Sequence, residues 1–151
     1  MRWERTIRRQ WLLGAFYALS AAAAVQLTRF DGGVAFLWGH GHAMGDEVLR
    51  IFAALARRIV RANDYVARIG GEEFVILFPS TSVEQALQVC DRLRREISAS
   101  PLAYGAGPVW VTVSGGLSQL SKAGLDDALK TADEALYRAK QSGRDQLAQA
   151  A

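Results

Sequence analysis

The sequence contains little cysteine, and beyond its first ten residues it has no excess of charge of either sign. The single cysteine, Cys90, excludes an intramolecular disulfide framework and fits a reducing compartment. The net charge of +3 comes from an N-terminal arm of four arginines and one glutamate, and the rest of the chain holds 14 basic and 14 acidic residues. We therefore discount binding to a nucleic acid polymer. No internal repeat or low-complexity tract is present, and 50% hydrophobic residues suffice for a core.

A long uncharged run, Trp11–Leu27, follows the basic arm. As a helix it would span roughly 25 Å, near the lower limit for crossing a bilayer. We interpret it as a transmembrane helix in the inner (cytoplasmic) membrane, with the arginines favouring a cytoplasmic N-terminus. Two alternatives remain open. One is a secretory signal peptide cleaved near Ala21–Ala24, and the other is a buried helix of a cytoplasmic protein.

Helical patterns recur in the remaining sequence. Apolar residues follow a helical period in Asp46–Ala62, in the segment after Ser82 and in Leu125–Lys140. Ser82 and Gln85 form a capping-box signature at the start of the second helix. Gly143 is placed to cap the third. Cys90 lies on the apolar stripe of the second helix, which indicates a packing role.

Strand patterns alternate with these helices. Tyr65–Ile69 and Phe74–Phe78 are short β-rich runs on either side of Gly70–Glu73, which predicts a β-hairpin. Val109–Val113 alternates as a further strand and runs into Ser114 and two glycines. The alternation predicts an α/β sandwich in which helices pack on a sheet.

The predicted hairpin turn carries the strongest chemical signal. Two glycines permit a tight turn and let a ligand approach the backbone. The two carboxylates that follow, Glu72 and Glu73, repel each other unless a cation is present. An ordinary solvated hairpin is the alternative, and the surrounding motifs weaken it.

These motifs resemble those of the GGDEF family, whose members are diguanylate cyclases. They occur in the family's order and spacing over residues 41 to 145, about two-thirds of the chain. They are Gly41–Asp46 (GHxxGD), Arg61–Asp64 (RxxD), Gly70–Phe74 (GGEEF, a variant of the GGDEF signature), Val111–Ser114 (a late strand) and Ala139–Arg144 (AKxxGR).

The resemblance implies a bacterial second-messenger reaction that converts two GTP molecules into cyclic di-GMP and two pyrophosphates. A ribose 3′-hydroxyl would attack an α-phosphate with the help of two metal ions, Mg²⁺ or Mn²⁺. By resemblance, Gly70 and Gly71 lie against the phosphates and Glu72 ligates the metal. Glu73 would position the ribose or support the metal. Each domain would hold one GTP, so catalysis requires a homodimer.

The resemblance also implies further binding residues. Asp46 would accept hydrogen bonds from guanine, and Lys140 and Arg144 would bind phosphates. Arg61 and Asp64 would form an inhibitory site for the product, cyclic di-GMP, and Arg92 falls where a supporting arginine often lies. A surface ion pair of little energetic value is the alternative for Arg61 and Asp64.

The start of the family pattern is absent. Counting back from Gly41, the metal-binding aspartate falls on Arg29, and its companion falls on Asp31, a coincidental match. A cation at the metal position repels Mg²⁺. The first strand, central in the family's sheet, is predicted to be missing or replaced, with 32–38 as a weak substitute. Unpaired strand edges would then reduce stability, and we expect little or no cyclase activity.

The N-terminal segment resembles instead the start of MASE1-type membrane sensors. We therefore divide the chain into residues 1–39, a basic arm and apolar helix, and residues 40–147, a partial GGDEF domain. One membrane crossing would place the domain outside, away from GTP, so we infer an internal deletion. Three hypotheses follow: an impaired cyclase, a degenerate module that binds cyclic di-GMP or a partner protein, and a truncation product without selected function.

Overall fold

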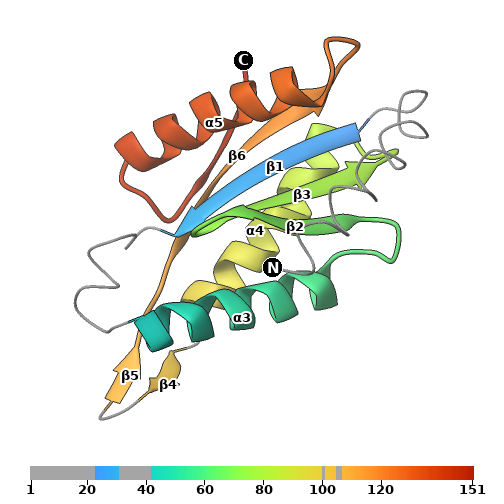
Figure 1. Cartoon of the computed structure of the whole chain (residues 1–151). Coiled ribbons are helices and arrows are strands. Elements are labelled where there is room, and N and C mark those ends of the chain that lie inside the picture. Colours follow the sequence, from blue (N-terminus) through green and yellow to red (C-terminus); the bar gives the residue numbers. More distant parts are fainter. Residues whose placement is uncertain (1–22, 31–41, 100, 105–106) are drawn as a thin grey trace.

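The structure, a computed structural model, describes residues 23–30, 42–99, 101–104 and 107–151. Its strands and helices are, in chain order, β1 (Ala23–Phe30), α3 (His42–Ile59), β2 (Tyr65–Gly70), β3 (Glu73–Pro79), α4 (Val83–Ala99), β4 (Leu102–Tyr104), β5 (Gly107–Val109), β6 (Val113–Leu120), α5 (Leu125–Gln141) and β7 (Leu147–Gln149). Five strands form one sheet in the order β2-β3-β1-β6-β7, and β4 pairs with β5. Helices α3 and α4 cover one face and α5 covers the other (Figure 1). The predicted α/β sandwich is confirmed.

The central strand of the sheet is β1, so of the two predicted possibilities, a missing or a replaced first strand, replacement is confirmed. It pairs antiparallel with β3 on one side, from Ala23↔Pro79 to Arg29↔Glu73, and with β6 on the other. The first strand is therefore replaced by sequence foreign to the family pattern, and both neighbouring edges are paired. The prediction of unpaired edges on β3 and β6, from which reduced stability was expected, is therefore wrong. The weaker substitute, residues 32–38, lies outside the described residues.

The predicted helix Trp11–Leu27 is wrong over its last five residues, because Ala23–Leu27 belongs to β1. Two open strand edges offer this segment backbone hydrogen bonds on both sides, and this tertiary pairing overrides its alanine-rich composition. Residues 11–22 lie outside the described part of the chain. Within the described residues, no helix has the length and hydropathy needed to cross a membrane.

Local sequence signals account for the helix boundaries. The capping box of α4 is confirmed, because the Ser82 amide donates to Oε1 of Gln85 at 3.1 Å and the Gln85 amide donates to Oγ of Ser82 at 3.3 Å. Gly143, with φ of 117°, follows the end of α5 as predicted. Helix α3 begins at His42 and ends at Ile59, a few residues before the predicted limits at both ends.

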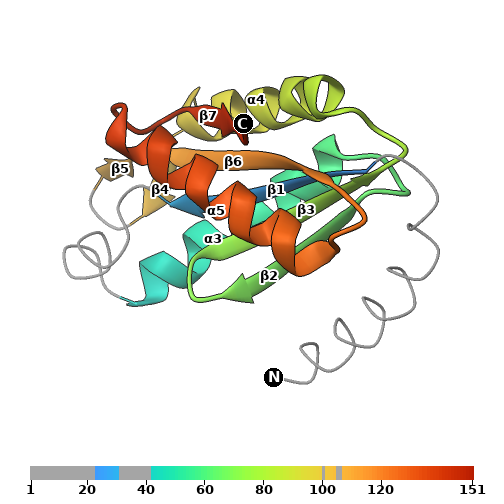
Figure 2. The ribbon, with the colours of Figure 1, turned by 90° about the horizontal axis from the view of Figure 1, so that it is seen from above.

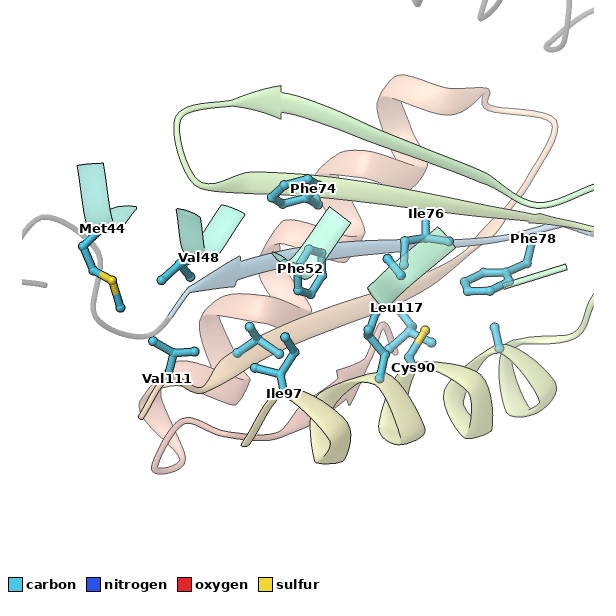
Figure 3. Close-up of a cluster of buried hydrophobic side chains, with 14 residues drawn as sticks. Met44, Val48, Phe52, Phe74, Ile76, Phe78, Cys90, Ile97, Val111 and Leu117 are labelled. Carbon is cyan, nitrogen blue, oxygen red and sulfur yellow. The ribbon is translucent and has the colours of Figure 1, made fainter. Parts of the chain in front are cut away.

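The larger core lies between the sheet and the helices α3 and α4 (Figure 3). Phe52 of α3 and Phe74 of β3 meet there with ring centroids 4.7 Å apart. Cys90 lies in the same core, and burial raises the pKa of its thiol well above the usual value. This burial confirms its packing role. A smaller core under α5 includes Val75 and Leu136.

The late strand differs from the prediction, because β6 begins where the predicted strand Val109–Val113 ends. Two glycines continue the strand instead of ending it. A Cβ built at Gly116 would lie 1.9 Å from the carbonyl oxygen of Ala132, so the glycine permits α5 to pack directly on the sheet. Figure 2 shows α5 lying over β6. One turn earlier along α5, Oγ of Ser118 donates to the carbonyl of Ala128 at 2.6 Å.

This close approach predicts that Gly116→Ala destabilises the domain by about 3 kcal/mol, because backbone atoms of α5 cannot move aside as a side chain can. Gly71→Ala is the matched control, since a Cβ there meets nothing within 4 Å, and its effect should stay within about 0.5 kcal/mol. Urea unfolding measures both free energies. Equal midpoints for Gly116→Ala and the unsubstituted protein would contradict the packing described here.

Candidate functional site

The hairpin tip between β2 and β3 is held by an arginine of β2. The Nε atom of Arg68 donates to the carbonyl oxygen of Gly71 at 2.7 Å, and its NH2 group donates to the same oxygen. The register of the two strands shifts between Arg68 and Gly70, as at a β-bulge, and Gly70 pairs with Glu73. The tip is therefore a defined turn fixed by a charged side chain.

The two glycines of the tip have different surroundings. A Cβ at Gly70 would lie 3.2 Å from Oε2 of Glu73, so this glycine makes room for the carboxylate that folds back over it. Gly71 is exposed and has open space around it. A ligand can therefore approach the backbone of Gly71 closely. The side chains of Glu72 and Glu73 are half-buried.

Several chain segments meet at this end of the sheet. Strand β1 ends beside the tip, in a row across three strands that places Arg29 in register with Glu73 on one side and Ser114 on the other. Because Ala132 and Leu136 of α5 contact Gly116 near the start of β6, the end of α5 lies at this same end. Figures 1 and 2 show the start of α3 there as well.

The structure places the predicted nucleotide-binding residues on these converging segments. Asp46 is exposed near the start of α3, and Lys140 is half-buried in the last turn of α5. Arg144 is exposed in the turn after α5, where its φ of 62° is left-handed. They lie on elements from both faces of the sheet, at the end that carries the hairpin tip. Their predicted roles stay predictions.

The described residues at the tip supply only part of the donor set that a pair of divalent metal ions would need. Mg²⁺ and Mn²⁺ prefer carboxylate and phosphate oxygens, and the tip offers Glu72 and Glu73. In the described part of the chain, no three histidine, cysteine, aspartate or glutamate residues gather to hold a metal ion. On the adjacent strand, the residue in register with Glu73 is Arg29. An arginine side chain supplies no metal ligand.

The predicted product-binding residues gather at the other end of the β2–β3 hairpin. The amide of Arg61 donates to Oδ2 of Asp64 at 2.8 Å, which closes the turn between α3 and β2. The NH2 group of Arg92 donates to the carbonyl of Ile59 at 2.8 Å, at the end of α3. The six residues of β2 separate this cluster from the tip by about 17 Å of strand.

Sequence reasoning missed three polar residues that shape these sites. Arg68 clamps the tip, and Arg94 of α4 donates to Asp145, which follows Arg144. Arg68 precedes the glycine pair by two residues, a local signal for a turn contact. Arg94 and Asp145 are 51 residues apart, and nothing in the sequence alone pairs them.

Comparison with known proteins identifies the family these features belong to. The family described as "Diguanylate cyclase, GGDEF domain" matches residues 36–146, more than half of the chain. The chain is 44% identical over 108 residues to the diguanylate cyclase DgcP of Pseudomonas aeruginosa, and 45% identical over 109 residues to the response regulator PleD of Caulobacter vibrioides. These matches cover 71% and 70% of this chain, but only 16% and 24% of the two relatives.

Solved structures show the same fold. The active GGEEF domain of a diguanylate cyclase from Vibrio cholerae superposes with a TM-score of 0.85 and 26% identity, over 95% of this chain and 96% of that one. The GGDEF domain of DgcB from Caulobacter crescentus, solved in complex with c-di-GMP, gives a TM-score of 0.88 at 24% identity, over 97% and 89%. The second likeness concerns the fold alone.

The variant Arg68→Ala tests whether the hydrogen bonds from Arg68 to the Gly71 carbonyl hold the hairpin tip. Losing the guanidinium frees the Gly71 carbonyl, so the amides of the tip should exchange with solvent about tenfold faster, as measured by hydrogen exchange in NMR spectra. Arg50→Ala is the control, because that side chain pairs with Glu47 on α3. Unchanged exchange at Gly71 and Glu72 would show that the strands alone hold the turn.

Proposed function

Because this chain belongs to the GGDEF family of diguanylate cyclase domains, we propose that the hairpin end of its sheet binds GTP but forms cyclic di-GMP poorly or not at all. Nucleotide binding is supported by the open backbone at Gly71 and by Lys140 and Arg144, the cations at the end of α5. Phosphates are stabilised by such cations and by close backbone amides. Asp46 supplies an exposed carboxylate for the guanine edge.

A single observation carries the proposed loss of activity: Arg29 stands in register with Glu73 at the centre of the sheet. Cyclisation in this family depends on carboxylates that hold metal ions against the phosphates. Here the strand that should add such a carboxylate adds a positive charge. The charge is compatible with binding of an anionic nucleotide and is unfavourable for a metal bound at the same place. We therefore expect the domain to bind GTP but to convert little of it into cyclic di-GMP.

The proposed reaction also requires a second copy of the domain and access to GTP. Two copies would have to bring their GTP molecules face to face, so turnover requires a homodimer, and the nucleotide requires the cytoplasmic side of the membrane. The chain spans less than a quarter of DgcP and PleD, so a sensory segment in a longer protein is compatible with it. The MASE1-like start and a membrane association remain predictions. The division at residue 39 does not match the fold, because residues 23–30 form the central strand of the sheet.

Incubation with GTP and Mg²⁺, followed by assay of cyclic di-GMP and pyrophosphate, tests the impairment. We expect no more than traces of product from the unsubstituted protein and at least about a tenfold increase from Arg29→Asp, which restores a carboxylate. Glu72→Ala should abolish product in both backgrounds. Rapid turnover by the unsubstituted protein would refute the impairment, and failure to bind GTP in equilibrium dialysis would refute the site.

A second function, binding of cyclic di-GMP, is favoured by the cluster at the far end of the hairpin. The hydrogen bond to Ile59 fixes the Arg92 guanidinium at the end of α3, two residues from Arg61. The Asp64 carboxylate is held by the Arg61 amide. Two guanidinium groups and a carboxylate are suited to the phosphates and guanine edges of a cyclic dinucleotide. A domain with this site and little turnover would act as a receptor.

Calorimetric titration with cyclic di-GMP tests this second function. Arg61→Ala should weaken binding about tenfold through loss of a charge-assisted contact. Asp64→Asn should do the same, and this variant keeps an oxygen that can accept the Arg61 amide, so the turn is preserved. Arg57→Ala, on the exposed side of the last turn of α3, is the control. If all four proteins bind cyclic di-GMP with equal affinity, or do not bind it, the ligand does not bind at Arg61 and Asp64.

A further inference from the structure

The turn that follows α5 has an unusual backbone. Gly143, Arg144 and Asp145 have φ values of 117°, 62° and 45°, so three consecutive residues are left-handed. Glycine adopts this region freely and aspartate tolerates it, but an arginine does so only when its surroundings hold it there. Strain of this kind persists where the neighbouring structure over-determines it, and it concentrates at functional sites.

The contacts around the turn show what holds it. The Arg144 amide donates to the carbonyl of Ala139 at 3.2 Å, which closes the end of α5. Nε2 of Gln146 donates to the same carbonyl at 3.0 Å, and the carbonyl of Gln146 accepts the Gly115 amide at 3.1 Å. These bonds fix both ends of the turn, to the helix and to β6. They leave Asp145, the last left-handed residue, to be fixed from another direction.

Asp145 is held by an arginine of α4. One NH1 group of Arg94 donates to the backbone carbonyl of Asp145 at 3.1 Å and to its Oδ1 at 2.9 Å. Nε of the same guanidinium donates to Oδ1 of Asp91 at 3.0 Å, so a second carboxylate, on α4, fixes the position of the arginine side chain. The side chain of Arg94 is only 17% exposed, in contrast to 72% for the adjacent Arg95, which also pairs with Asp91.

The Arg94 guanidinium keeps its positive charge in this arrangement. Burial lowers the pKa of Arg94, but the hydrogen bonds from its guanidinium to Asp145 and Asp91 outweigh that effect and raise the pKa overall. The guanidinium is therefore charged at neutral pH. A bond from a charged donor to both a carbonyl and a carboxylate of one residue restricts the dihedral angles of that residue.

We infer that Arg94 is a positioning residue for nucleotide binding: by holding Asp145, it keeps the strained turn in the conformation that directs Arg144 toward the nucleotide phosphates. This inference rests on the proposed GTP site. It assigns a role to a residue of α4, a helix on the opposite face of the sheet from α5. Arg94 itself does not touch the nucleotide. Its effect is transmitted through its hydrogen bonds to the carbonyl and carboxylate of Asp145.

The test is a double-mutant cycle read out by equilibrium binding of GTP and of GMP. Arg94→Met and Arg144→Met should each weaken GTP binding by a similar factor, about tenfold. The double variant should lose little more, because both changes remove the same contact. GMP, which has one phosphate, should lose less affinity than GTP in every variant. A purely structural defect would weaken both nucleotides equally.

Two further variants complete the experiment. Arg95→Met removes the other arginine paired with Asp91 and should leave GTP affinity unchanged. Asp145→Asn keeps the carbonyl contact and tolerates the left-handed region while losing the ion pair, so it should weaken GTP binding about threefold. This milder variant decides the question if Arg94→Met does not fold.

The outcomes separate the two proposals. Absence of GTP binding by the unsubstituted protein would overturn the proposed site, and this inference with it. GTP binding that Arg94→Met and Asp145→Asn leave unchanged would overturn the positioning role while leaving the site in place. Additive losses in the double variant would also overturn it, because independent effects show that Arg94 does not act through Arg144.

Discussion

Backbone pairing of β1 with two neighbours at once is the constraint on which the rest of the structure depends. Strands β3 and β6 are separated by the width of one strand, and β1 fills that place along its whole length. Without it, the hairpin of β2 and β3 and the pair of β6 and β7 would each present an open edge. The helices on both faces would then cover two half-sheets. The cores described above therefore depend on a strand whose sequence departs from the family pattern.

The same pairing determines the chemistry of the hairpin end. Register fixes which residue of β1 lies beside the tip, and that residue is Arg29. A shift by one position would turn a different side chain to that face of the sheet. The strand thus restores the architecture with a residue at this position that supplies no carboxylate. Backbone hydrogen bonds are indifferent to the side chain that a metal site requires, so the sheet forms whether or not this position carries a carboxylate.

The two faces of the sheet contribute differently to the site. On one face, α5 packs closely against β6 at the bare backbone of Gly116. On the other face, α4 extends Arg94 to the turn that follows α5. The turn is consequently held from both layers, and its left-handed residues are maintained by contacts that come from distant parts of the chain. Rigidity of this kind favours binding of an ordered anionic ligand.

The sequence by itself determined the elements whose signals are local. The hairpin follows from glycines between β-rich runs, and the start of α4 follows from Ser82 and Gln85, because each interaction spans only a few residues. The order of short motifs indicated the family in the same way. Tertiary structure decided three other features: that Ala23–Leu27 is a strand, that β6 continues through its glycines, and that Arg94 holds Asp145. Each depends on hydrogen bonds or packing between segments far apart in the chain, which local propensity does not record.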